Sequence, residues 1–350
     1  MERVEAWFAG ELLDRPPVRF ARHNAEYEGQ VLPAGPGSVR DRWLDAEQRV
    51  ESFRSSIAGR RFFGETFPVF WPNLGPDVYA AFYGCPLVFD ETTSWALPFL
   101  REKTDIASLR LDPDSQYLAA LQKMTRLALD SCRGEFLVGY TDLHPGIDAA
   151  AAWRGTEALC LDFYDDPDFA LELLDLAGRD FASIYGRMDS TLKSAGQLSV
   201  TWMGIPAAGR MHVPSSDIAS MISPAHFDRY VLPEIERECA VTTHTIFHVD
   251  GSGVARHLDR LLELPGIRAF QWVQGFGEEE PIMRWIPLID KIRAKGKGVV
   301  VNLKPSELDP FMDALDPRGL YLCMEASSEE EELAVIGKLE RWTGKNRTGR

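Results

Sequence analysis

The feature that most constrains the fold is a regular alternation, from about residue 134 onward, of short apolar runs with longer segments of helical periodicity. The runs are rich in Val, Ile and aromatic residues, and most are apolar on both faces, as strands buried inside a parallel sheet must be. Strands that alternate with helices in this order predict βα units and a parallel sheet. We expect these strands at 135–142, 198–204, 244–250, 267–273, 298–303 and 320–325.

The earlier part of the chain can supply the remaining units of a closed barrel. Residues 86–91, followed by an amphipathic segment at 115–129, predict a seventh βα unit. Either 16–20 or 67–71 could provide an eighth strand. A doubly wound open sheet is the competing architecture, but neither GxGxxG nor GxxxxGK[ST] follows an early strand.

We therefore predict a single α/β domain of the (β/α)8 TIM barrel type. The barrel should occupy residues 81–350, and residues 1–80 should form an N-terminal extension that packs on it and lids or plugs one end. The length of 350 residues exceeds the roughly 250 of a minimal barrel, which leaves room for such an extension.

Charge and cysteine content exclude several classes of function. Lys and Arg total 38 against 53 Asp and Glu, a net charge of −15, and no basic cluster offsets it, so we expect no nucleic-acid and no membrane partner. The N-terminus lacks the pattern of a signal peptide, and no apolar run is long enough for a membrane helix, which predicts a cytoplasmic protein. Five scattered cysteines without a CxxC pair indicate neither a disulfide framework nor a zinc ribbon.

Active sites of (β/α)8 barrels lie at the carboxyl ends of the strands, which nominates residues by position. His248 and Asp250, in FHVDG, are two apart at a strand end and so project to the same side. They could bind a divalent metal or work as an acid/base pair; alternatively, His248 bonds a neighbouring strand and Asp250 caps the next helix. Cys323 could complete a His/Asp/Cys metal set with an open position, with Glu325 as a substitute ligand, or be a core cysteine.

A second pair follows an earlier strand. Asp142 and His144, in TDLHPG, could move a proton during catalysis, or could respectively fix the turn and lie on the surface. Tryptophans near strand ends would suit a sugar, a flat heterocycle or a methyl-bearing cation, although they could instead fill core space. The substrate-binding candidates chosen in this way are Glu91, Trp95, Trp202, Arg210 and Trp272.

With these residues in place, the chain resembles the uroporphyrinogen decarboxylase superfamily, which also contains corrinoid-linked, zinc-dependent methyltransferases. The segments that carry the resemblance are DRPPVRFARHNAEY (14–27), LVGYTDLHPGIDAAAAWRGTEALCLDFYDDPDF (137–169) and MISPAHFDRYVLPEIERE (221–238). They match in order and cover nearly the whole chain. The resemblance implies a barrel fold and a site at the strand carboxyl ends, and dimers are common in that superfamily, so a homodimer is a further expectation.

The resemblance implies different site residues for its two branches. Arg22 matches the first of two N-terminal arginines of the decarboxylases, but Glu26 stands at the place of the second, and a carboxylate there would repel an acidic substrate. The methyltransferase branch binds zinc through His-x-Cys and a late cysteine. Here these positions correspond to His248, Asp250 and Cys323.

We therefore expect a superfamily enzyme that transfers a methyl group with the help of zinc to a thiol or a corrinoid-linked acceptor, the acceptor being carried by a small molecule or a corrinoid protein. The first alternative is a metal-free acid/base decarboxylase of a carboxylated, tetrapyrrole-like substrate, in which Arg22 and Arg210 would hold carboxylates. The second alternative is a barrel that binds a ligand and has no catalytic activity.

Overall fold

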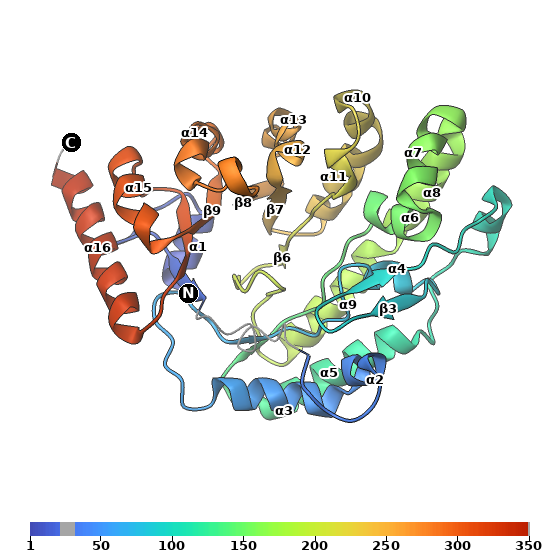
Figure 1. Cartoon of the computed structure of the whole chain (residues 1–350), viewed down its shortest axis with the longest axis horizontal. Helices are drawn as coiled ribbons and strands as arrows, with labels where there is room; N and C mark the ends of the chain where they lie inside the picture. Colours follow the sequence, from blue (N-terminus) through green and yellow to red (C-terminus); the bar gives the residue numbers. More distant parts are fainter. Residues whose placement is uncertain (22–31, 349–350) are drawn as a thin grey trace.

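The structure is a computed structural model that describes residues 1–21 and 32–348 of the chain. Figure 1 shows β6 to β9 on the inner side of an arc of helices that runs from α10 to α16. None of the described helices is both long and apolar enough to cross a membrane.

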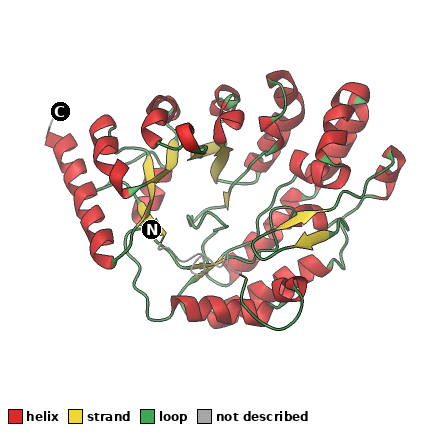
Figure 2. Cartoon of the chain, in the orientation of Figure 1, coloured by secondary structure: helices red, strands yellow, loops and turns green. Residues whose placement is uncertain are grey.

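The main sheet has six parallel strands in the order β1-β10-β9-β8-β7-β6. Figure 2 shows this sheet curling, with helices along its outer side. Four of its strands have the bounds expected from the sequence: β7, β8, β9 and β10. The strands are β1 (Val18–Ala21), β6 (Met211–His212), β7 (His244–Asp250), β8 (Ile267–Val273), β9 (Gly298–Leu303) and β10 (Leu320–Glu325).

β2 (Val69–Phe70) and β5 (Leu137–Val138) form a separate pair of parallel strands. In the sequence, both come after β1 and before β6, which are the two edge strands of the main sheet. Single backbone hydrogen bonds connect this pair to its surroundings: Glu65 N donates to Val18 O of β1 at 2.7 Å, and Tyr140 N donates to Val200 O at 3.0 Å. The expected strand at 198–204 is reduced to one antiparallel bridge between Ser199 and Ala207. The parallel strands thus form a curled six-stranded sheet and a two-stranded sheet.

The expected strand at 86–91 is not part of a βα unit. β3 (Leu87–Phe89) pairs antiparallel with β4 (Ser94–Ala96) as a hairpin outside the main sheet. The local cause is a tight turn at Asp90, whose Oδ1 accepts hydrogen bonds from the backbone N–H groups of Thr92 and Thr93, both at 2.7 Å. An apolar run that returns on itself in this way cannot continue into a parallel sheet.

Residues 1–80 contribute both strands and a packing element. β1 and β2 come from this segment, so the extension expected there is partly built into the sheets. Helix α1 (Glu2–Phe8) buries Trp7, whose indole N–H donates to Gly319 O at 3.0 Å and whose ring lies at an edge-on angle to Tyr321. Gly298, at the start of β9, is required here because a Cβ would approach the Trp7 ring to 2.7 Å.

The two faces of the sheet carry different hydrophobic clusters. Along β7, Ile246 belongs to a small cluster with Trp7, whereas Phe247 and Val249 belong to the large cluster shared with the surrounding helices. Because side chains alternate along a strand, His248 lies on the same face as Ile246, which we call the inner face. The α-helices after α1 are α2 (Val39–Leu44), α3 (Ala46–Ile57), α4 (Val78–Ala81), α5 (Gln116–Ser131), α6 (Ile147–Arg154), α7 (Thr156–Asp165), α8 (Pro167–Arg179), α9 (Phe181–Ser194), α10 (Pro224–His226), α11 (Leu232–Ala240), α12 (Gly251–Ala255), α13 (Leu258–Leu262), α14 (Ile286–Ala294), α15 (Leu308–Ala314) and α16 (Glu329–Thr348).

Candidate active site

A hydrogen-bonded chain of three side chains lies beyond the carboxyl ends of β5 and β6. The Nε2 atom of His144 is 2.7 Å from Oδ2 of Asp142, and its Nδ1 atom is 2.7 Å from Oγ of Ser215. Asp142 is buried and His144 is half-buried. The structure therefore brings together the two residues that the TDLHPG motif nominated, and adds a serine that the sequence reasoning did not single out.

The charge of His144 follows from its neighbours. Burial lowers the pKa of His144, but the charge and hydrogen bond of Asp142, with smaller contributions from Asp148 and Asp217, raise it to about 10. His144 is thus an imidazolium near neutral pH, and it donates N–H groups to both Asp142 and Ser215. A protonated imidazole cannot act as a general base, but it can stabilise a developing negative charge.

Three more carboxylates surround this chain, and sequence reasoning missed all of them. Burial and the charge of Asp217 raise the pKa of Asp148 to about 7, while its oxygens accept hydrogen bonds from the Asp217 backbone N–H at 3.2 and 3.4 Å. Burial also raises the pKa of Asp77, whose Oδ2 accepts from Ala96 N at 2.8 Å. A carboxyl group with a pKa near 7 is suited to proton transfer at neutral pH, which makes Asp148 the best candidate for a general base.

His248 lies beside this cluster on the inner face of β7. Its backbone N–H donates to Pro214 O at 2.9 Å, directly before Ser215, so the two sites share the segment that follows β6. Its Nδ1 atom is 2.6 Å from Oε1 of Gln271 on β8, and its ring meets Trp202 edge-on with centroids 5.3 Å apart. The amide oxygen of Gln271 is positioned to accept a hydrogen bond from Nδ1 of His248.

The zinc ligands expected from the sequence are not assembled. Zinc sites need three or four donors around one ion. Within residues 1–21 and 32–348, no group of three or more His, Cys, Asp or Glu side chains could hold a metal ion. β8 and β9 lie between β7 and β10 and so separate His248 from Cys323, which is buried, whereas Asp250 is exposed at the start of α12 without capping its backbone. The set of His248, Asp250 and Cys323 therefore does not fit a zinc ion in this structure.

The substrate-binding candidates are scattered over the molecule. Trp272 is completely buried on the outer side of β8 against Trp285, and so cannot line a site on the inner face. Arg210 lies at the opposite end of the sheet from His248, because its carbonyl oxygen accepts from Thr243 N and His244 N at the start of β7.

Two further candidates lie on or beside the hairpin. Glu91 pairs with Arg42 at 2.5 Å, and Trp95 is 44% exposed on β4. Trp202 contacts His248 at the described site. Arg22 lies outside the described residues.

The space beside Trp202 is narrow. A cavity of about 40 Å³ is bordered by Thr201, Trp202 and Gly204 on one side and by Arg19 and Phe67 on the other. Arg19 donates a hydrogen bond to Met203 O and so connects β1 with this segment. The cavity holds little more than one water molecule.

Comparisons with known proteins show that the chain has a fold similar to that of a solved structure. No protein-family model matches the chain, and no curated protein matches it in sequence. Among solved structures, the fold is similar to that of a methyltransferase from Methanosarcina mazei, with a TM-score of 0.63 and 11% sequence identity over 97% of each chain. At this identity the similarity establishes the arrangement of the chain and no more.

Proposed function

We propose that this protein is an enzyme that transfers a methyl group at the carboxyl ends of β5, β6 and β7. The observation that carries the proposal is the coincidence, at this edge, of a charged His144–Asp142 pair with a carboxyl group, Asp148, whose pKa is near 7. The fold likeness to a methyltransferase over 97% of both chains supports the choice of reaction.

We also propose that the fold is a (β/α)8 barrel. The two-stranded sheet of β2 and β5 would fill the gap between β1 and β6, and the hydrogen bonds of Glu65 to Val18 and of Tyr140 to Val200 lie where neighbouring barrel strands would meet. An active site at the carboxyl ends of the strands is the arrangement that such barrels use.

The reaction we propose is a nucleophilic displacement at the methyl carbon. The acceptor is a thiol or a corrinoid-linked group. For a thiol, the Asp148 carboxylate takes the S–H proton, the sulfur forms a bond to the methyl carbon, and the bond to the donor breaks with its electron pair leaving on the donor. A thiol with an ordinary pKa of about 8.5 can be deprotonated by a carboxylate with a pKa near 7 at modest cost.

The charged pair and the serine have supporting roles. The His144 imidazolium, held by Asp142, stabilises the negative charge that the acceptor sulfur gains when it loses its proton to Asp148. The Ser215 hydroxyl, which accepts from His144, has its own proton left to donate to a bound ligand. No step is assigned to zinc, because the donors of this chain do not form a zinc site.

A direct assay tests the proposal. The purified protein is mixed with methylcobalamin and 2-mercaptoethanol, and loss of the methyl–cobalt bond is followed by absorbance. We expect catalysed transfer by the wild type, a fall of about 100-fold for His144→Gln, and no change for Asp313→Asn, an exposed carboxylate on α15. Transfer that is equally fast in His144→Gln would refute the assignment of the site. Absence of transfer by folded wild-type protein would refute the reaction.

A further inference from the structure

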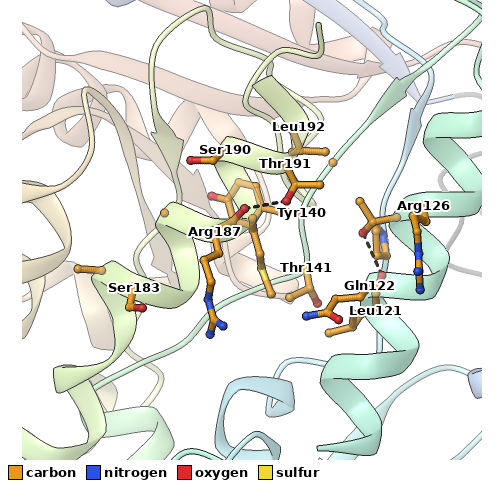
Figure 3. A pocket seen from close by; sticks show the side chains of 16 residues that line it. Leu121, Gln122, Arg126, Tyr140, Thr141, Ser183, Arg187, Ser190, Thr191 and Leu192 are labelled. Atoms are coloured by element: carbon orange, nitrogen blue, oxygen red, sulfur yellow. Dashed lines mark hydrogen bonds between the residues drawn. The ribbon is translucent and has the colours of Figure 1, made fainter. Parts of the chain in front are cut away.

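A cavity lies away from the candidate active site, between α5 and α9. Its volume is about 790 Å³, within the range of pockets that bind small molecules. Figure 3 shows the two helices on either side, with Tyr140 and Thr141 lying between them at the end of β5.

The walls of this groove carry two cations without an anionic partner. Arg126 extends from α5 and Arg187 from α9 (Figure 3), and neither guanidinium makes a hydrogen bond or ion pair in the part of the chain that the structure describes. Both side chains are exposed, so the two guanidinium groups are accessible to a ligand in the groove. Guanidinium groups bind carboxylates and phosphates through strong, directed hydrogen bonds.

A second observation points to a ligand at the same place. Thr141 borders the groove with only 1% of its surface exposed, and its hydroxyl has no hydrogen-bond partner among the described residues. A buried polar group without a partner is costly and rare in folded proteins, so each one calls for an explanation. A ligand that reaches the floor of the groove would supply the missing partner.

The groove also offers apolar contact. Leu121 of α5 and Leu192 of α9 are almost completely buried at its sides, and Met188 and Pro72 border it as well. Exposed hydroxyl and amide groups, those of Gln122 and Ser183 among them, lie nearer the rim. This combination of apolar sides with two cations at the rim matches a molecule that has an apolar body and an anionic end.

We propose that the groove between α5 and α9 binds a small organic anion with an apolar body, its anionic end held by Arg126 and Arg187. The site is separate from Asp142, His144 and Asp148, although Thr141 directly precedes Asp142 in the chain. Occupancy of the groove would therefore contact the segment that carries the proposed catalytic pair.

Calorimetric titration of the full chain with octanoate tests the proposal, with octan-1-ol and inorganic phosphate as the neutral and the purely anionic probes. We expect saturable binding of octanoate, with both other probes at least about tenfold weaker, and a loss of at least about tenfold in octanoate affinity for Arg126→Ala and for Arg187→Ala. The matched control Arg101→Ala, an exposed arginine on a loop outside the groove, should bind like the wild type.

Thr141→Val separates binding from folding. The valine removes the unpartnered hydroxyl and keeps the shape, so the ligand-free variant should melt no lower than the wild type while binding octanoate several-fold more weakly. Equal binding of octanoate and octan-1-ol, binding of phosphate alone, or unchanged affinity in the Arg126→Ala/Arg187→Ala double variant would overturn the proposal. A further result would also overturn the proposal: the wild type does not bind octanoate, and the double variant sediments differently from the wild type. The groove would then be a contact between copies of the chain.

Discussion

Replacing Asp142 with asparagine should convert His144 from an imidazolium to a neutral imidazole near neutral pH. The Oδ2 atom of Asp142 is 2.7 Å from Nε2 of His144, and its charge and hydrogen bond are the two largest causes that raise the His144 pKa. Burial, which lowers that pKa, would then be opposed only by Asp148 and Asp217. We expect the pKa of His144 to fall from about 10 in the wild type to about 7 or below.

The size of the effect on stability can be worked from the same contacts. A rise in pKa from the ordinary value of 6.5 to about 10 corresponds to at most about 5 kcal/mol. His144 keeps a partly exposed edge, and solvent screening reduces the expected loss in Asp142→Asn to about 2–4 kcal/mol. Because the folded-state pKa of this histidine is raised, the stabilisation is fully present below pH 6.5 and is lost as the pH rises through 10. The difference between variant and wild type should therefore be largest in mildly acidic solution and shrink in alkaline solution.

Two measurements check this reasoning. Proton NMR titration of the Cε1–H resonances follows the seven histidines, and the spectrum of His144→Gln assigns the His144 signal. Urea unfolding at pH 6 and at pH 10 gives the free energy of unfolding of wild type, Asp142→Asn and the surface control Asp313→Asn. A His144 pKa that stays within about one unit of the wild-type value in Asp142→Asn would refute the reasoning.

Three further predictions concern the sheets and the metal. Glu65→Gln should lower the free energy of unfolding by about 3–5 kcal/mol in urea titration, because Glu65 and Arg15 form a buried pair at 2.7 Å and Glu65 also accepts from Val18 N; a loss below about 1 kcal/mol would contradict this. Trp272→Ala should cost about 3–5 kcal/mol of stability yet leave kcat/KM for methyl transfer unchanged below its melting temperature, since Trp272 packs on the outer side of β8; a selective loss of kcat/KM would place it at the site. Elemental analysis should find zinc well below one ion per chain and the same content in His248→Ala; stoichiometric zinc that this variant loses would contradict the ligand geometry.

The sequence predicts the second half of the sheet much better than the first. β7 to β10 are runs of six or seven residues, apolar on both faces, and their bounds agree with the expectation. The earlier strands are short and irregular because glycines and prolines interrupt them. Gly139 comes so close to the next segment that a Cβ would lie 2.9 Å from Val200 O. Such close approaches depend on the whole fold and leave no periodic pattern in the sequence.

The same contrast applies to the candidate site. The spacing of Asp142 and His144 indicated a pair, and the structure brings them into contact. Asp148 and Asp217 are 69 residues apart and meet through a loop after β6, so no local pattern could connect them. For His248, the alternative of a hydrogen bond to a neighbouring strand describes its contact with Gln271. β8 and β9 lie between His248 and Cys323 in the sheet, and the described residues contain no group of three ligands that could hold a metal ion.

The most direct test of the account is the pH dependence of methyl transfer from methylcobalamin to 2-mercaptoethanol by wild type and by Asp148→Asn. Burial and Asp217 raise the Asp148 pKa to about 7, and a base works only when ionised, so the wild-type kcat should rise with pH through about 7 and then level off. Asp148→Asn should be at least about 100-fold slower and should lack this inflection. A variant that keeps the wild-type rate and the inflection near pH 7 would contradict the assignment of Asp148 as the base.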